Sequence, residues 1–244
     1  MCDVCGCGDP HKVTIDVHTS LLAKNDRDAA HLRAHFAEDG VLALNVMGSP
    51  GSGKTALIEA VARSGRDLKL AAVSGDLATS LDAERLASAG VPSASITTGS
   101  ACHLDAAMVH HALHDERIAR AVHESDVFFV ENVGNLVCPA IYDLGQAKNV
   151  VVLSVTEGVD KPLKYPVMFR VADLVVVSKV DLVPYLPGTS LTTLRENIAR
   201  VAPSAEVIPC SAVSGEGVGE LLAWLEAQRA ALAPRSAAAR HEHP

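Results

Sequence analysis

The stretch between residues 48 and 55 has the spacing of a phosphate-binding loop. It reads G-S-P-G-S-G-K-T and satisfies G-x-x-x-x-G-K-[ST] at every position. Glycines let the backbone turn its N–H groups onto phosphate oxygens, and a helix that starts at the loop adds its positive end. Lys54 supplies a charge for the β- and γ-phosphates, and Thr55 supplies a hydroxyl for Mg²⁺. The predicted phosphate-binding residues are Gly48, Ser49, Pro50, Gly51, Ser52, Gly53, Lys54 and Thr55.

An S-K-V-D segment in the second half of the chain has the chemistry to select a base, and it resembles the guanine-reading N-K-x-D element of GTPases. A carboxylate at Asp181 can accept hydrogen bonds from guanine N1–H and from the 2-amino group, whereas adenine offers no such pair of donors. The stem of Lys179 can cover the face of the base. Ser178 replaces the usual asparagine, so we expect a weakened contact to the base or to the phosphate loop. Ser211 and Ala212 resemble the S-A-K loop whose backbone contacts the guanine oxygen.

Carboxylates at the ends of two apolar segments can complete a hydrolytic site. Glu131 ends D-V-F-F-V-E, and Asp76 ends an earlier strand-like segment. Each position suits an acidic residue that holds Mg²⁺ or orients the attacking water, and the sequence does not separate these two roles. Asp82 and Glu84 follow on a helical pattern, where solvation at the helix surface is the simpler expectation. The predicted catalytic residues are Lys54, Asp76 and Glu131, and the predicted magnesium ligands are Thr55, Asp76 and Glu131.

Cysteines and a histidine form two further groups that suit soft or borderline metals. Three of the six cysteines form C-x-x-C-G-C near the start of the chain, where three thiolates and the amino terminus can close around Zn²⁺ or Ni²⁺. The second group combines a Cys-His pair with a cysteine shortly beyond Glu131, so a metal there would respond to the segment that senses the γ-phosphate. The predicted metal ligands are Cys2, Cys5, Cys7, Cys102, His103 and Cys138. Cys210 is expected to be a buried thiol.

Alternating helical and strand-like segments must position these residues. Short apolar runs predict buried strands, and amphipathic stretches between them predict helices. We expect helices at 18–39, 56–64, 80–89, 105–121, 190–201 and 217–231, and strands at 41–47, 68–74, 126–131, 149–155, 173–178 and 205–209. This alternation is typical of a parallel sheet covered on both faces. The predicted fold is α/β, a three-layer P-loop NTPase with a mostly parallel sheet, an N-terminal helix and a flexible Cys-rich arm.

Bulk composition limits the classes of function and partner. The 244 residues are 48% hydrophobic and 3% aromatic, which suits one α/β domain with an aliphatic core. A net charge of −8 argues against nucleic acid as a partner, and no apolar run is long enough to span a bilayer. The N-terminus lacks a signal-peptide pattern, so we expect a cytoplasmic protein with reduced thiols. We expect a flexible metal-binding arm at 1–17, a P-loop GTPase domain at 18–232 and a disordered tail at 233–244.

Taken in order, these motifs resemble the HypB family, the nickel-incorporation GTPases of [NiFe]-hydrogenase maturation. The resemblance rests on C-x-x-C-G-C, G-S-P-G-S-G-K-T, G-D-L-A-T-S-L-D-A-E-R, S-A-C-H-L-D, E-N-V-G-N-L-V-C-P and S-K-V-D, and it covers nearly the whole chain. The urease accessory GTPase UreG is similar, but it would carry Cys-Pro-His where this chain has Cys138, Pro139 and Ala140. The chain lacks the long histidine-rich tract of some relatives, which argues against a storage role.

The resemblance implies a SIMIBI-class GTPase that hydrolyses GTP to GDP and phosphate and dimerises when GTP binds. It implies a Ni²⁺ or Zn²⁺ site at the dimer interface, carried onto Cys102, His103 and Cys138, and a tight nickel site in the N-terminal motif. It also implies a HypA-type nickel chaperone, SlyD and the hydrogenase large subunit precursor as partners. Two alternatives stay open: a passive nickel-binding storage protein whose P-loop only stabilises it, and an accessory GTPase for urease or another nickel enzyme.

Overall fold

A seven-stranded sheet forms the centre of the molecule. The computed structural model describes residues 12–65, 67–76, 79–99 and 101–232, with side chains from residue 21 onward. The strands are β1 (Leu42–Met47), β2 (Leu70–Asp76), β3 (Ser93–Thr97), β4 (Val127–Glu131), β5 (Lys148–Ser154), β6 (Leu174–Ser178) and β7 (Glu206–Cys210). Their order across the sheet is β3-β2-β4-β1-β5-β6-β7, and each pair of neighbours runs parallel. All the carboxyl ends therefore meet at one edge of the sheet, where ligands bind in open α/β folds.

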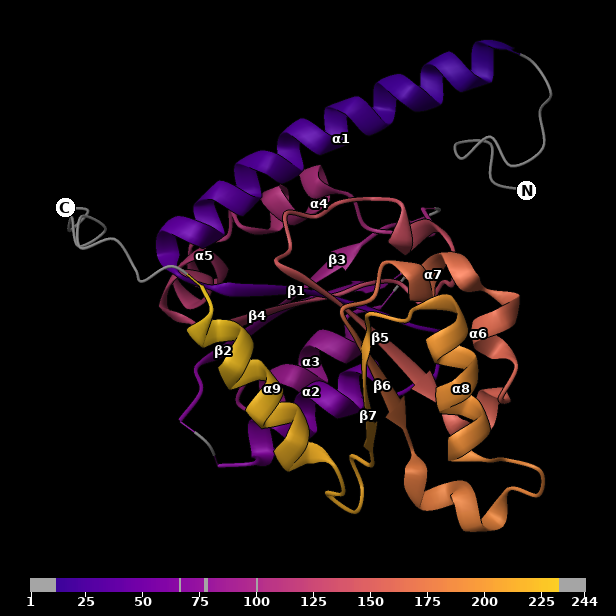
Figure 1. Cartoon of the computed structure of the whole chain (residues 1–244). Helices are drawn as coiled ribbons and strands as arrows, with labels where there is room; N and C mark the ends of the chain where they lie inside the picture. The colour runs from indigo at the N-terminus through magenta and orange to yellow at the C-terminus, as the bar shows by residue number, and fades with distance from the viewer. Residues whose placement is uncertain (1–11, 66, 77–78, 100, 233–244) are drawn as a thin grey trace.

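Helices cover both faces of the sheet, as Figure 1 shows. The helices are α1 (Lys12–Asp39), α2 (Lys54–Arg63), α3 (Leu81–Ser88), α4 (Ala106–Ala112), α5 (Glu116–Glu124), α6 (Lys161–Lys164), α7 (Pro166–Arg170), α8 (Leu191–Val201) and α9 (Val218–Ala230), with short 3₁₀ turns η1 (Cys138–Ala140), η2 (Val155–Glu157) and η3 (Val180–Tyr185). One face packs against α2, α3 and α9. The other face is shared between α1, α4 and α5 over one half and α7 and α8 over the other. The predicted three-layer α/β fold is confirmed.

The strands are apolar on both faces because both faces are buried. In β1, Leu42 and Leu44 point into the layer under α2 and α9, while Ala43 points toward α1. The few aromatic side chains lie where the layers need bulk: Phe36 of α1 packs on Phe128 of β4, with ring centroids 5.5 Å apart. The core is otherwise built from Val, Leu, Ile and Ala, as the composition predicts.

The observed elements differ from the predicted ones at several points, and the short helices α6 and α7 were not predicted. The single helix expected at 105–121 is wrong, because the carboxylate of Asp115 accepts a hydrogen bond from the Arg117 backbone N–H and starts the separate helix α5. Strand β3 was not predicted, since this edge strand is only partly buried and has little apolar pattern. Helix α1 begins at Lys12, earlier than residue 18. Residues 1–11 and 233–244, where the arm and the tail are expected, lie outside the described residues.

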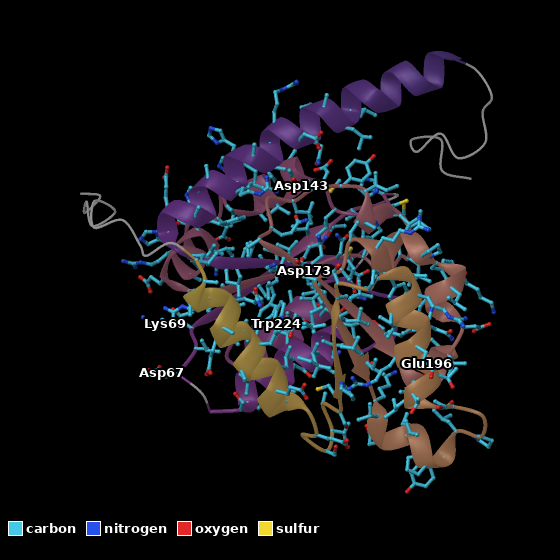
Figure 2. The ribbon with its side chains drawn as sticks, viewed as in Figure 1. Asp67, Lys69, Asp143, Asp173, Glu196 and Trp224 are labelled. Atoms are coloured by element: carbon cyan, nitrogen blue, oxygen red, sulfur yellow. The ribbon has the colours of Figure 1, made fainter. Side chains whose placement is uncertain are left out.

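Helix α1 is fastened to the loop that precedes β5. The Asn25 side chain donates to the backbone carbonyl of Asp143 across 2.8 Å, and Arg33 forms an ion pair with the Asp143 carboxylate at 2.6 Å. Figure 2 shows Asp143 beneath α1. A Cβ on Gly145 would lie 2.7 Å from the Cβ of Leu32, so glycine is required where this loop meets the helix. Among the described residues, no helix combines the length and apolar character needed to cross a membrane.

Candidate nucleotide site and metal centre

The phosphate loop connects β1 to α2 at the carboxyl edge of the sheet. A cleft of about 470 Å³ opens over it and reaches the ends of β2 and β4. Gly53 has φ 98°, a left-handed conformation that favours glycine, and it caps the N-terminus of α2. A Cβ on Gly48 would lie 2.4 Å from the Val152 carbonyl oxygen, so only glycine lets the loop lie against β5. The backbone therefore has the form of an anion cradle at a helix N-terminus.

Lys54 lies inside this cradle. Its side chain is buried, and its Nζ atom lies 3.4 Å from the carbonyl oxygens of Gly48 and Ser49. Burial lowers the pKa of Lys54, while the negative charges of Glu131 and two other carboxylates oppose that change. An ammonium held only by two long contacts is placed to exchange them for phosphate oxygens.

Glu131 ends β4 beside the ends of β1 and β2, because Val46 and Ser74 are its neighbours in register. Its carboxylate is almost fully buried; the Thr55 hydroxyl lies 2.7 Å from Oε1 and the Ser74 hydroxyl 3.4 Å from Oε2. Burial raises the pKa of Glu131, and the hydrogen bond from Thr55 and the charge of Lys54 partly oppose this effect. The structure thus places a buried acid at the position expected for a magnesium or water-orienting group.

Asp82 corrects the expectation of a solvated helix-surface residue. Its Oδ1 atom lies 3.0 Å from the Thr55 hydroxyl, which therefore faces two carboxylates. Asp76 lines the same cleft, and its carboxylate accepts a hydrogen bond from Thr79 at 2.5 Å. Glu84 is exposed and accepts from Ser80, as expected. The hard oxygen ligands that fit Mg²⁺ are thus Thr55, Glu131 and Asp82, two of which carry a carboxylate.

The base-selecting segment is joined to the phosphate loop. The Ser178 hydroxyl donates to the backbone carbonyl of Ser52 across 2.6 Å, and the Lys179 ammonium donates to the carbonyl of Gly51 across 2.7 Å. The predicted loss of contact to the phosphate loop at Ser178 is therefore wrong, because the shorter side chain still reaches the loop. Lys179 has φ 60°, a left-handed conformation rare in non-glycine residues, which turns the chain sharply after β6.

The remaining base-site predictions lie at the ends of neighbouring strands. Asp181 is half-buried at the start of η3, directly after β6. Ser211 is fully buried after β7, and its hydroxyl accepts from the backbone N–H groups of Val213 and Ser214 at 3.3 and 3.1 Å. Ala212 is partly buried in that turn. Strand order brings β6 and β7 together, so these residues share one end of the sheet.

Cys102, His103 and Cys138 converge on one point although two separate loops carry them. Their ligand atoms all lie within 4.8 Å of one another, with the two sulfurs 3.2 Å apart and Cys102 Sγ 3.8 Å from His103 Nδ1. The His103 ring stacks on Tyr142, with centroids 3.8 Å apart. Burial lowers the pKa of His103, which favours the neutral imidazole that binds metal. The thiols are half-buried, and this donor set suits a borderline cation.

A buried amide ties this metal centre to the nucleotide cleft. Asn132, directly after Glu131, accepts from the Leu104 backbone N–H at 3.1 Å and donates to the Asn45 side chain at 3.1 Å. Leu104 follows His103, and Asn45 lies in β1 just before the phosphate loop. Farther along, a Cβ on Gly134 would lie 2.8 Å from Pro50 of the loop.

The segment from residue 132 to Cys138 therefore touches both sites. Its Asn135 forms a β-bridge with Gly48 of the phosphate loop, and η1 then begins at Cys138 itself. A change in the loop's position would be transmitted to one thiolate through packed backbone. The N-terminal cysteines Cys2, Cys5 and Cys7 lie outside the described residues, so their predicted metal site stays a prediction.

Comparisons with known proteins identify the family to which the chain belongs. The model of the CobW/HypB/UreG nucleotide-binding domain matches residues 42–209. Hydrogenase maturation factor HypB of Azotobacter vinelandii is 50% identical over 214 residues, covering 87% of this chain and 69% of that protein. The chain belongs to the HypB family. Family membership does not by itself determine what each site residue does, which depends on the geometry of that residue in this chain.

Two Helicobacter pylori comparisons add to the HypB assignment. Its hydrogenase/urease maturation factor HypB is 43% identical over 196 residues, which is 80% of each chain. The crystal structure of HypB from this organism in complex with nickel is 40% identical, with a TM-score of 0.81, and covers 90% of this chain and all of that one. Within the HypB fold, the residues whose roles the sequence did not reveal are Asp82, Asn132 and Tyr142. Only contact across the fold shows these roles, because the motifs that contain Asp82 and Asn132 do not show which residues they meet, and Tyr142 lies outside those motifs.

Proposed function

We propose that this chain is a GTP-hydrolysing metallochaperone that acts in the cytoplasm and delivers nickel to the [NiFe]-hydrogenase large subunit precursor during maturation. The observation that carries the proposal is the convergence of Cys102, His103 and Cys138 at the end of a segment that starts beside Glu131 and packs on the phosphate loop. A relative at 50% identity is a hydrogenase maturation factor, and a related HypB structure contains nickel. Nickel is the cargo in this proposal, and the binding and hydrolysis of GTP control when the protein retains it and when it releases it.

Guanine selection is supported by the way Ser178 and Lys179 anchor the loop that carries Asp181. The two hydrogen bonds to the phosphate loop fix the distance between the phosphates and the base-binding end. The Asp181 carboxylate then accepts from guanine N1–H and the 2-amino group. The Ser211 N–H already donates to the Glu216 carbonyl at 2.8 Å, so the Ala212 backbone N–H is the donor offered to the guanine oxygen. ATP lacks the two donors and leaves the carboxylate unpaired, which penalises it strongly.

Hydrolysis follows from the electrostatics of the cleft. Backbone N–H groups of the loop and Lys54 stabilise charge on the transferred phosphoryl group. Thr55, Glu131 and Asp82 would hold Mg²⁺, which supplies charge neutralisation for the phosphates when bound. Glu131 and Asp76 remain the two candidates for orienting the attacking water, and the burial of Glu131 beside Lys54 favours the first.

Nickel or zinc would take the two thiolates and the neutral imidazole, with room for a further ligand from a partner. Exposed apolar side chains flank this centre: Val137 is 43% exposed and Ile141 is 44% exposed. Such a rim suits contact with a second copy of the chain when GTP is bound, and later with a HypA-type chaperone, SlyD or the hydrogenase precursor. The N-terminal Cys2, Cys5 and Cys7 would form a separate nickel site.

A titration of nickel and zinc, with and without a non-hydrolysable GTP analogue, tests the proposal. We expect the nucleotide to change nickel affinity by about tenfold, a typical coupling. The chain should hydrolyse GTP far faster than ATP, and Cys102→Ala with Cys138→Ala should remove nickel from this centre while GTP turnover continues. Equal affinities with and without nucleotide, or equal use of ATP, would contradict the proposal.

Asp181→Asn sharpens the guanine assignment. An amide at this position can still accept from N1–H, but it also offers an N–H donor that suits the 2-oxygen of xanthine rather than the 2-amino group of guanine. We expect GTP turnover to fall and XTP turnover to rise. Unchanged GTP use would place the base elsewhere. Delivery to urease is a second candidate, because one relative is named a hydrogenase/urease maturation factor; activation of each apo-enzyme by the loaded chain separates the two.

A further inference from the structure

Four histidines outside both sites line one pocket between α1 and α4. The pocket has a volume of about 140 Å³, and its histidines are His31, His35, His110 and His114. His31 and His35 form an i, i+4 pair on α1, the spacing that puts two imidazoles on one helical face, as in helical zinc sites, while His110 lies on α4 and His114 in the turn that follows it. We propose that these four histidines form an additional transition-metal site, for a borderline divalent cation such as Ni²⁺ or Zn²⁺, separate from the Cys102–His103–Cys138 centre.

The packing of α1 on α4 places His31 and His35 at nearly the same level along the helix axes as His110 and His114. The Asn25 side chain of α1 accepts a hydrogen bond from the Ala106 backbone N–H at 2.9 Å, which fixes α1 against the start of α4. From that contact His31 and His35 lie about 9 and 15 Å along α1, and His110 lies about 6 Å along α4, at 1.5 Å per residue, with His114 just beyond the end of α4. The offset of about 3 Å is less than one helical turn. Figure 1 shows α1 lying along α4 and α5.

The four rings need only side-chain rotation to converge. Their nitrogen atoms do not yet form a group within 4.8 Å, since within the described part of the chain only the Cys102, His103 and Cys138 atoms do. All four imidazoles are exposed, so changes of rotamer are rapid and inexpensive. His110 and His114 are already in edge contact, with centroids 5.0 Å apart. The floor of the pocket is apolar, because Leu32 and Val122 are 2% and 1% exposed.

A carboxylate behind the pocket orients one ring. His35 Nδ1 lies 3.4 Å from Asp39 Oδ2, one turn along α1, and the side chain of Asp39 is only 8% exposed. This leaves His35 Nε2 for a metal, and a carboxylate on the second nitrogen is the usual partner of a metal-bound histidine. Neutral imidazoles favour nickel, copper and zinc over magnesium or calcium. A bound ion would join α1 to α4.

The test uses the full chain with its other metal ligands removed. The background variant carries Cys2→Ser, Cys5→Ser, Cys7→Ser, Cys102→Ser, Cys138→Ser, His241→Ala and His243→Ala. Nickel is the probe, followed by titration calorimetry and by melting temperature. We expect one nickel per chain, no sulfur-to-nickel charge-transfer absorption, and a melting temperature that rises with nickel concentration. No binding to this background would overturn the proposal.

Removing either pair identifies the ligands. His31→Ala with His35→Ala, or His110→Ala with His114→Ala, should each abolish the nickel-induced rise in melting temperature. His111→Ala is the matched control, because this neighbouring histidine does not line the pocket, and it should keep the rise. The exposed positions make unfolding an unsuitable explanation, and unchanged GTP turnover in the pair variants without the cysteine substitutions checks it. Two nickel ions per chain, one lost with each pair, would contradict a single shared site.

Asp39→Asn tests the orienting carboxylate. We expect nickel affinity in the background variant to fall about tenfold, the lower end of the effect of such partners on metal sites. Asp39 also contacts His123, with Nδ1 to Oδ1 at 2.8 Å, so His123→Ala serves as the control that disturbs Asp39 without touching His35. Equal losses in both variants would assign the effect to packing around Asp39 and overturn its role in the metal site.

Discussion

The nucleotide cleft and the Cys102–His103–Cys138 centre lie next to each other but are restrained very differently. In the cleft, Lys54 and Glu131 are 8% and 2% exposed, and each has two hydrogen-bond partners within 3.4 Å. At the candidate metal centre the two thiols are half-buried and contact each other, and Cys102 Sγ also lies 3.8 Å from His103 Nδ1. One site is fixed by the core of the protein, and the other is held by the ends of two loops.

This difference suits the separate tasks that we propose for the two sites. Hydrolysis depends on charges that are already in place when the substrate binds, since reorganising them would raise the barrier. Release of a metal depends on ligands that move apart, and loops with few restraints allow such movement. The 132–138 segment connects the two regimes, because it begins in the buried network at Asn132 and ends at an accessible thiol.

Of the variants proposed for comparing the two sites, Lys54→Ala should have the largest effect, and that effect should be confined to the rigid nucleotide cleft. Removing the one ammonium in the cradle eliminates charge stabilisation in the transition state, so we expect GTP turnover to fall about 10²- to 10³-fold. Nickel affinity of the Cys102–His103–Cys138 centre in the absence of nucleotide should stay unchanged. Steady-state phosphate release and nickel titration of the same preparation measure the two quantities.

The same variant separates a chaperone from a storage protein. If the GTPase governs release, the Lys54→Ala protein should load nickel normally but fail to activate apo-hydrogenase. Lys179→Ala, which removes a hydrogen bond at the rim of the same loop, is the milder companion and should weaken nucleotide binding more than turnover. Nickel delivery at the normal rate by the Lys54→Ala protein would exclude the proposal that GTP hydrolysis controls when nickel is released.

The same contrast explains how much was predictable from sequence. The phosphate loop is contiguous, and its glycines, lysine and threonine have fixed spacing, so the fold and the cradle follow directly from the chain. Asp82 was assigned to a solvated helix surface because helical periodicity does not reveal which turn faces Thr55. Asn132 was also missed, since its partners Leu104 and Asn45 are distant in sequence and meet only in the sheet.

The candidate metal centre was only partly accessible from the sequence, which could group Cys102, His103 and Cys138 by type and position but could not show that they meet. Cys102 and Cys138 are separated along the chain, and local spacing does not place them 3.2 Å apart. The break between α4 and α5 was missed for a related reason: one polar residue, Asp115, outweighs a continuous amphipathic pattern by capping a new helix. Patterns of apolar residues locate layers well, whereas single polar contacts decide where elements end and which loops meet.

Asn132→Ala should sharpen the comparison by cutting the connection between the two regions. Its loss leaves the buried N–H of Leu104 without a partner, so we expect the free energy of unfolding to fall by about 1–3 kcal/mol. The change in nickel affinity caused by a GTP analogue should shrink toward zero. Asn149→Ala removes a similar amide on the other side of Asn45 and should keep that coupling. Equal coupling in both variants would mean that the signal travels elsewhere.

Glu131→Gln tests the strain stored on the rigid side through pH. Burial raises the pKa of Glu131 above its ordinary value of 4.5. At a pH between 4.5 and the folded pKa, the folded chain therefore binds more protons than the unfolded chain. Its contribution to stability is therefore present below pH 4.5 and is lost as pH rises through the folded pKa.

The glutamine variant should lose this dependence. We expect the nucleotide-free protein to gain about 1.4 kcal/mol of stability at neutral pH for each unit of raised pKa, and to lose GTP turnover. Denaturant unfolding of both proteins across pH 4 to 8 measures the difference. If the two curves of stability against pH run parallel, ionising Glu131 in the folded chain costs little free energy. The nucleotide cleft is then less strained, relative to the candidate metal centre, than the burial of Glu131 indicates.

The smallest expected effect concerns the thiol of Cys210, which serves as an internal reference for the reactivity of Cys102 and Cys138. Burial raises the pKa of Cys210 to about 11, with a further contribution from the negative charge of Glu216. At pH 8 Cys210 is therefore almost entirely the unreactive thiol, whereas the half-buried Cys102 and Cys138 can be reached by an alkylating reagent. Peptide mass analysis after brief iodoacetamide treatment should find the latter two modified and Cys210 unmodified, and nickel should protect only the pair. Modification of Cys210 at the same rate as Cys138 would show that the end of β7 opens as readily as the metal loops, which the packing of β7 beneath α9 argues against.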